Sequence, residues 1–179
     1  MGYLAEEVGY PFNQIPTEAF GSYRGGVEGW GSICGALVPA ISVINLVVEK
    51  EDRASLVNEL MAWYKEFPFP EFQPAGLDLP GVPINSSLCH VSVTKWMEET
   101  GYGPRSSPER GERCAGLTAD VSKFTAAMLN KYFEESSYTG QYAVSPATGQ
   151  CMACHEENVK PYAHGKEDCV ECHGDPHED

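Results

Sequence analysis

Two Cys-x-x-Cys-His pentapeptides lie close together near the C-terminus and give the clearest chemical signal in the chain. They occupy residues 151–155 and 169–173, with thiols at Cys151, Cys154, Cys169 and Cys172 and imidazoles at His155 and His173. Two cysteines at this spacing can both form thioethers with the vinyl groups on one edge of a porphyrin, and the adjacent histidine can ligate its iron. The pattern therefore predicts two covalently attached c-type haems.

A structural zinc site is the competing interpretation, because two Cys-x-x-Cys pairs joined by a short segment are also typical of four-cysteine zinc sites. Zinc does not require a histidine directly after each pair. Two further histidines, His164 and His177, lie in the same segment, where a six-coordinate haem iron needs a distal ligand. We therefore favour haem over zinc or disulfides.

Ligand counting sharpens the haem hypothesis. Two six-coordinate haems need four axial ligands, so beside the proximal His155 and His173 two more come from His90, His164 and His177. His177 follows His173 too closely to reach the opposite face of the same haem easily, so it is expected to serve the other haem or a partner subunit. Methionine ligation by Met97 or Met128 is the rival, although methionines on helix faces usually pack in cores. Bis-histidine ligation would favour a low potential and leave no open iron position.

Net charge and composition limit the classes of partner that the protein is expected to bind. The chain has 179 residues, 42% of them hydrophobic, which is enough for one ordinary core. A net charge of −14 would repel phosphate backbones and anionic lipid surfaces, so we expect no nucleic-acid partner. A redox protein with a basic docking patch is the expected partner.

Covalent haem attachment in bacteria takes place outside the cytoplasmic membrane, which predicts a periplasmic or extracellular protein. The start of the chain lacks a basic region followed by an apolar region, so we expect a targeting signal to have been removed. The longest apolar run, residues 33–48, is shorter than a membrane span and contains Pro39 and Asn45. It is interpreted as a core helix.

Apolar periodicity predicts four helices between about residues 15 and 135 and few strands. The first follows the glycine-rich residues 21–31 and is expected to kink at Pro39. The second runs from about 52 to 67, the third from a cap at Ser86 or Ser87 to Gly101, and the fourth from residues 106–108 to about 135. The predicted inward stripe of the first helix consists of Cys34, Val38, Ile41, Asn45 and Val48.

These patterns predict an all-α protein with two parts. Residues 1–135 form a helical, cysteine-containing domain with a small bundle-like core, and residues 136–179 form a loop-rich segment that binds the two haems. The second part has too few apolar side chains to offset the entropy of ordering it. We therefore expect the porphyrins to act as its hydrophobic core.

Three cysteines lie outside the haem motifs. Cys34, Cys89 and Cys114 are each predicted on the inward stripe of a different helix, which is where unreactive buried cysteine normally lies. Convergence of the three stripes would also allow an iron-sulfur centre, completed by His90 or by a neighbouring subunit. A disulfide between Cys89 and Cys114 is the other alternative.

Residues 25–37 (GGVEGWGSICGAL), residues 85–93 (NSSLCHVSV), Cys114 and the paired haem motifs together resemble the split-Soret cytochromes c. The helical part also resembles the broader C-GCAxxG-C-C family. The resemblance implies an all-helical dihaem protein, usually a homodimer, with closely stacked haems and an electron-transfer role in an anaerobic periplasm. The family pattern includes an additional upstream cysteine that residues 1–20 do not supply.

The sequence thus predicts a dihaem c-type electron carrier rather than a catalyst, forming a homodimer or a larger homo-oligomer that shares haem ligands or stacks its haems. One alternative is a haem enzyme, such as a small-molecule reductase, with one open iron position. The other is a zinc-stabilised binding module.

Overall fold

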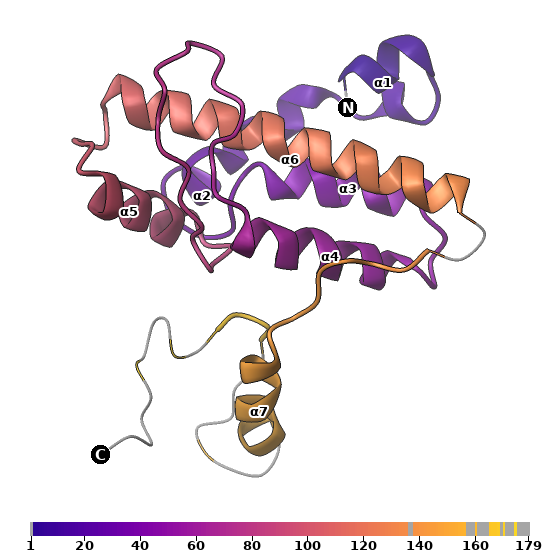
Figure 1. Cartoon of the computed structure of the whole chain (residues 1–179). Helices are drawn as coiled ribbons and strands as arrows, with labels where there is room; N and C mark the ends of the chain where they lie inside the picture. The colour runs from indigo at the N-terminus through magenta and orange to yellow at the C-terminus, as the bar shows by residue number, and fades with distance from the viewer. Residues whose placement is uncertain are drawn as a thin grey trace.

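Helices make up the regular structure of this computed structural model (Figure 1), which describes residues 2–135, 138–156, 160, 165–168, 170 and 174. Within those residues the remaining regular features are two isolated antiparallel bridges, Ile33 with Leu88 and Phe69 with Val82. The predicted all-α fold is confirmed. In chain order the elements are α1 (Gly2–Glu7), the 3-10 helices η1 (Phe12–Gln14) and η2 (Thr17–Tyr23), α2 (Arg24–Val27), α3 (Leu37–Val47), α4 (Arg53–Glu66), α5 (Cys89–Thr100), α6 (Pro108–Glu134) and α7 (Pro146–His155).

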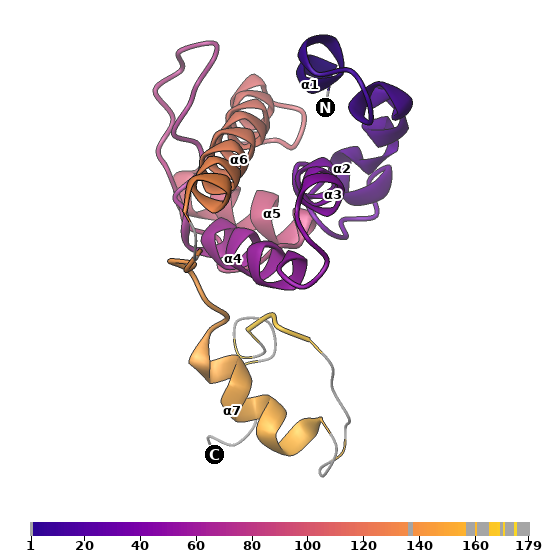
Figure 2. The ribbon, with the colours of Figure 1, turned by 90° about the vertical axis from the view of Figure 1, so that its right-hand side faces the viewer.

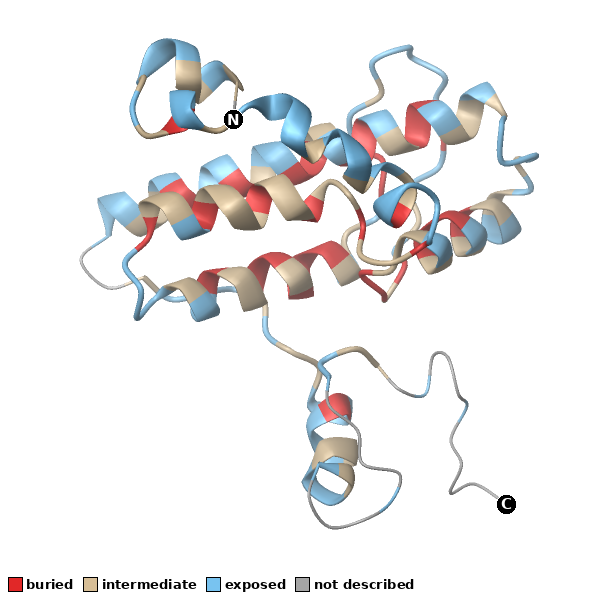
Figure 3. Cartoon of the chain, turned by 180° about the vertical axis from the view of Figure 1, so that it is seen from behind, coloured by how far each residue is buried: buried red, intermediate tan, exposed pale blue. Residues whose placement is uncertain are grey.

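Helices α3, α4 and α6 pack against one another and enclose the main core (Figures 1 and 2). Their buried residues face inward (Figure 3). Trp63 lies at the centre, stacked on Phe124 with ring centroids 4.0 Å apart and meeting Phe69 edge-on at 5.5 Å. Aromatic side chains of this size contribute much of the burial energy of a small core.

Helix α3 begins later than the sequence pattern predicted, and this changes its buried face. The helix starts at Leu37, so Cys34 precedes it, and its buried residues are Leu37, Ala40 and Ile44. Asn45, predicted on the inward stripe, is exposed. The prediction failed because it counted helical turns from Cys34, which is not helical. Pro39 lies in the first turn, where its missing N–H removes no intrahelical hydrogen bond, so the kink expected there has no cause.

The ends of the other core helices follow mostly the predicted signals. Ser107 caps α6 by accepting a hydrogen bond from the Arg110 N–H at 3.2 Å, with a proline at the first helical position. Gly101 ends α5 in the left-handed conformation. The predicted cap of α5 at Ser86 or Ser87 is wrong, because the residue before its first turn is Leu88 and no side chain caps the helix. Both serines are engaged elsewhere.

Two buried carboxylates on α6 hold the proline-rich connection between α4 and α5. Asp120 accepts hydrogen bonds from the N–H groups of Glu71 and Phe72 at 2.8 and 3.0 Å, and Glu112 accepts one from Ala75. The connection passes so close to the helix that a Cβ on Gly116 would lie 2.0 Å from the Phe72 carbonyl oxygen. A second apolar cluster lies under this connection and contains Leu79, Ile84 and Trp96.

The C-terminal segment leaves the bundle after α6. Residues 138–145 run along α4 (Figure 1), where the buried Glu59 accepts hydrogen bonds from the Tyr138 hydroxyl and the Gln141 N–H. Burial and the Glu59 carboxylate both raise the pKa of the Tyr138 phenol. Helix α7 then projects away from the bundle (Figures 1 and 2). In the part of the chain that the structure describes, none of the helices has both the length and the apolar character that crossing a bilayer requires.

Candidate functional site

The first Cys-x-x-Cys-His motif ends helix α7, which the sequence analysis did not anticipate. Ser145 caps the helix by accepting a hydrogen bond from the Ala147 N–H at 3.3 Å, and Pro146 occupies its first position. Cys151, Cys154 and His155 therefore stand at i, i+3 and i+4, which is one face of a helix. Two thiols and an imidazole on one face can engage the same ligand. The Ser-Pro pair before the motif was the available signal for this helix.

The second motif falls on residues outside the described part of the chain. Cys169, Cys172 and His173 lie there, together with the distal candidates His164 and His177. Their predicted roles stay predictions.

His90 lies at the start of α5 against the glycine-rich loop. Its Nδ1 is 2.9 Å from the Gly31 carbonyl oxygen. Because a carbonyl can only accept, this nitrogen carries the proton and Nε2 keeps its lone pair, the tautomer expected of a metal-ligating histidine. The cavity beside it, of about 130 Å³, is lined by residues from 25–31, 89–94 and 105–110. His90 thus faces a surface of the helical domain.

The methionine candidates are both part of apolar clusters. Met128 is buried in the main core, and Met97 packs against the cluster around Trp96. This is the ordinary packing role of methionine.

The loop and bridge before α3 bring two of the remaining cysteines together. The Cys34 N–H donates to the Ser87 carbonyl at 2.9 Å, and the Cys89 N–H donates to the Ser32 carbonyl at 2.7 Å. Gly26, in the left-handed region at φ +67°, lies beneath this pairing, and a Cβ there would lie 2.8 Å from the Cβ of Cys89. The glycine-rich stretch is therefore required for the close packing of the two segments.

Cys34, Cys89 and Cys114 line one cavity of about 380 Å³. Cys34 comes from the bridge, Cys89 from the first position of α5, and Cys114 from α6, so the predicted placement of each on the inward stripe of a helix is wrong for Cys34. The predicted convergence of the three is nevertheless found. Cys89 and Cys114 are both free thiols, so the alternative disulfide is not formed.

The electrostatics of this cavity favour a negatively charged occupant. Its lining includes Arg24, Arg110 and Arg113 and no carboxylate from the described residues. Among those residues, buried side-chain nitrogens or oxygens without a hydrogen-bond partner are the Nε atoms of Arg110 and Arg113. An unpaired buried cation is costly, so an anionic group in the cavity would remove that cost.

A buried hydrogen-bond chain lies behind the thiols. Arg113, 1% exposed, donates through Nη2 to the Ser92 hydroxyl at 2.8 Å, and that hydroxyl lies 3.3 Å from the Tyr64 hydroxyl. Burial raises the pKa of the Cys34 thiol, which a hydrogen bond from Tyr64 opposes. The sequence analysis did not predict this hydrogen-bond chain. The adjacency of Arg113 and Cys114 on an apolar helix could have indicated it.

As the side chains stand, no three histidines, cysteines or acidic residues of the described ranges are arranged to hold a single metal ion. Burial, followed by the nearby Cys34 and Cys114 sulfurs, raises the pKa of the Cys89 thiol. The three thiols thus line one cavity, and for Cys34 and Cys89 burial favours the protonated thiol.

The fold agrees with the comparisons to known proteins. Residues 1–128 match the model of the family described as "Putative redox-active protein (C_GCAxxG_C_C)", and the chain belongs to this family. It is 33% identical over 182 residues to the split-Soret cytochrome c of Desulfovibrio desulfuricans (strain ATCC 27774), a match that covers 97% of this chain and 65% of the relative. The predicted resemblance is confirmed.

A solved structure gives the same result. It is described as "A novel iron centre in the split-Soret cytochrome c from Desulfovibrio desulfuricans ATCC 27774". The match has a TM-score of 0.87 at 34% identity and covers 96% of this chain and 75% of that one. The chain therefore shares both the helical domain and most of the overall course of that cytochrome.

Proposed function

We propose that this protein is a dihaem c-type cytochrome that transfers electrons between redox partners. The observation that carries the proposal is the placement of Cys151, Cys154 and His155 on one face of α7. The matched relative and the matched structure are both split-Soret cytochromes c, which supports the same assignment.

Each motif would hold one haem in the same way. Each thiol S–H adds across a vinyl C=C bond of the porphyrin, so two thioethers form without a leaving group, and the histidine turns an imidazole nitrogen to the iron. Bound haem supplies reversible one-electron chemistry. The protein's contribution is to fix the ring, provide its axial ligands and limit its contact with water. Cys169, Cys172 and His173 repeat this arrangement for the second haem, with His164, His177 and His90 as the distal candidates.

The cysteine cavity fits a second kind of iron site. Cys34, Cys89 and Cys114 supply thiolates, which are the preferred ligands of iron-sulfur centres. The unpaired Nε atoms of Arg110 and Arg113 fit the negative charge of such a centre. We infer an iron-sulfur centre here, with one-electron chemistry complementary to that of the haems.

The remaining properties follow from the haem assignment. Haem attachment outside the cytoplasm supports a periplasmic or extracellular location. The net charge of −14 supports docking to a partner through a basic patch. A homodimer, or a larger homo-oligomer, would allow one subunit to supply a distal histidine to another.

The test is made on the protein produced with the cytochrome c maturation machinery. Intact mass should show two covalently bound haems, and alkaline pyridine should give the haem c spectrum. Cys151→Ser combined with Cys154→Ser should remove one haem, whereas Cys114→Ser, the matched control, should keep both. Absence of haem c in the native chain, with zinc found instead, would contradict the proposal.

Two further measurements test the iron-sulfur centre and the coordination of the haem irons. Iron and acid-labile sulfide beyond the haem content should be present in the native protein and lost in Cys34→Ser. Carbon monoxide should not bind the reduced native protein if both irons are six-coordinate. Binding without denaturation would instead favour the haem enzyme with an open position.

A further inference from the structure

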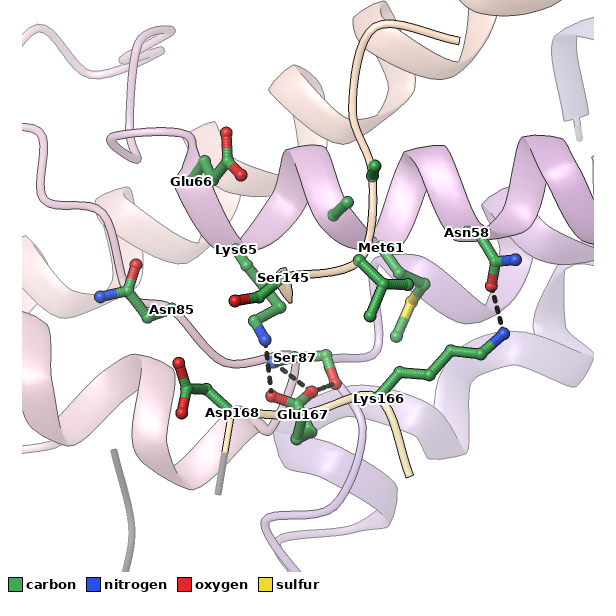
Figure 4. A pocket seen from close by; sticks show the side chains of 13 residues that line it. Asn58, Met61, Lys65, Glu66, Asn85, Ser87, Ser145, Lys166, Glu167 and Asp168 are labelled. Atoms are coloured by element: carbon green, nitrogen blue, oxygen red, sulfur yellow. Dashed lines mark hydrogen bonds and ion pairs between the residues drawn. The ribbon is translucent and has the colours of Figure 1, made fainter. Parts of the chain in front are cut away.

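Glu167 lies at a junction between the two parts of the molecule (Figure 4), where a cavity of about 430 Å³ separates α4 from the C-terminal segment. Its carboxylate accepts two hydrogen bonds from Ser87, one from the N–H at 3.0 Å and one from the hydroxyl. The Nζ of Lys65 on α4 is 3.7 Å from the other carboxylate oxygen. A single side chain of the C-terminal segment thus contacts two elements of the helical domain.

The backbone of Glu167 makes a third connection. Its carbonyl accepts a hydrogen bond from the Thr148 hydroxyl at 3.1 Å, and Thr148 is the buried residue of α7. The preceding residue, Lys166, donates to the Asn58 side chain of α4 at 2.8 Å (Figure 4). Thr148 lies three residues before Cys151, and Glu167 lies two residues before Cys169. Both haem motifs are therefore tied to Glu167 over short stretches of chain.

Ser87 carries the connection to the cysteine cavity. It is buried, and its carbonyl accepts the hydrogen bond from the Cys34 N–H at 2.9 Å. One residue thus binds Glu167 on one side and Cys34 on the other. Cys89 follows two residues later and lines the same cavity as Cys34.

We propose that Glu167 is a positioning residue that couples the haem segment to the cysteine cavity through Ser87. This inference rests on the proposed function for its redox role. In the proposed function, Cys34, Cys89 and Cys114 would hold an iron centre and the two Cys-x-x-Cys-His motifs would hold the haems, and both kinds of group would supply one-electron chemistry. The Glu167 and Ser87 contacts hold the two sites at a fixed separation, on which the rate of transfer depends.

The first test measures hydrogen exchange and needs no assumption about cofactors. In Glu167→Ala, exchange at the Ser87 N–H should rise about ten- to a hundredfold, since its charge-assisted hydrogen bond to Glu167 is lost. Exchange at the Cys34 N–H should rise with it, because that group donates to the Ser87 carbonyl, which Glu167 no longer holds in place. Val121, in the core of α6, should keep its rate. Ser87→Ala, which keeps the backbone N–H and loses the hydroxyl, should give a smaller rise. Unchanged exchange at Cys34 overturns the coupling.

The second test follows electron transfer in the haem-loaded protein after rapid photoreduction of the iron centre, read as the absorbance of reduced haem. Glu167→Ala should slow transfer at least about tenfold by loosening the junction. Glu66→Gln, an exposed carboxylate lining the same cavity, is the matched control and should leave the rate unchanged. An unchanged rate in Glu167→Ala overturns the redox role.

The two tests distinguish a failure of this inference from a failure of the proposed function. If the native chain carries no haem c, its mass spectrum shows this before any variant is made, and the exchange measurement still decides the coupling. Glu167→Gln keeps the size of the side chain and replaces Glu167→Ala should the latter fail to fold. It should give the same directions with smaller changes.

Discussion

The helical domain and the C-terminal segment reach order by different means. In the domain, helices α3, α4 and α6 bury their own apolar side chains around Trp63. In the segment, α7 buries a single residue, Thr148. The segment contacts the domain through hydrogen bonds and through Tyr138 and Tyr142, which pack against the domain's core. A segment of this composition lacks an apolar core of its own. In the function proposed above, the haems would supply the apolar material around which α7 packs.

The same two regions also treat cysteine differently. Cys34 is buried in the arginine-lined cavity, whereas Cys154 on α7 is exposed. An exposed thiol is accessible to the chemistry of haem attachment. An enclosed thiol among buried cations is suited to a centre that must be kept from solvent. In the proposed function, one residue type would thus serve two kinds of iron site because its surroundings differ.

The largest effect is expected when the C-terminal segment can no longer hold the haem of its first motif. In the Cys151→Ser and Cys154→Ser double variant we expect residues 146–156 to lose protection from proteolysis, because the proposed haem, their apolar packing partner, is gone. The helical domain should keep its far-ultraviolet circular dichroism and its unfolding midpoint. Limited proteolysis read by mass spectrometry measures this. A segment that stays protected would show that its own side chains suffice.

The next largest effect is expected in the core. Trp63→Ala should lower the free energy of unfolding by about 3–5 kcal/mol, since Trp63 is 3% exposed and stacks on Phe124. Trp30, 87% exposed, gives a control of the same residue type, and Trp30→Ala should cost under about 0.5 kcal/mol. Denaturant unfolding followed by circular dichroism compares the two. Similar losses would contradict the placement of the core.

Thiol alkylation sharpens the contrast between the two cysteine environments. In reduced protein lacking haem and iron, Cys34 should react at pH 8 at least about tenfold more slowly than Cys154, because burial both encloses the thiol and raises its pKa. Peptide mapping after timed alkylation gives the rates. In denaturant the difference should disappear.

The same raised thiol pKa values predict how stability depends on pH. Folded Cys34 and Cys89 hold their protons to higher pH than the unfolded chain does. Their contribution is therefore fully present below the ordinary thiol pKa of about 8.5 and is lost as the pH rises through the folded values. The metal-free protein should thus lose stability in alkaline solution, and Cys34→Ser should reduce that loss.

The smallest effect on stability is expected from removing a helix cap, and the chain offers two caps of the same kind for comparison. Ser107 and Ser145 each precede a proline and each accept one backbone hydrogen bond, at the starts of α6 and α7. Ser107→Ala should lower the free energy of unfolding by about 1 kcal/mol, because α6 unfolds with the core. Ser145→Ala should leave the unfolding midpoint unchanged and raise hydrogen exchange within α7 alone. Equal effects would mean that the two regions unfold as one.

Several parts of this molecule followed from local sequence signals. The start of α6 at Ser107 and Pro108, the end of α5 at Gly101 and the extent of α4 were predicted correctly, because caps and apolar periodicity act over a few residues. The start of α3 was misplaced because the pairing with residues 87–88, distant in sequence, engages Ile33 and Cys34 and keeps them out of the helix. The helix that carries the first haem motif was missed because its apolar periodicity is weak.

The sequence by itself determined the chemistry of the protein: the thiol and imidazole spacing of each haem motif, the acidic surface and the all-α class are properties of residue type and local order. Tertiary structure alone decided that Cys34, Cys89 and Cys114 share a cavity with Arg110 and Arg113, whose Nε atoms have no hydrogen-bond partner, and that Glu167 reaches Ser87. These residues are brought together by packing between separate elements. Local sequence patterns do not predict which residues of separate elements meet, because the periodicity of each element is independent of the element packed against it.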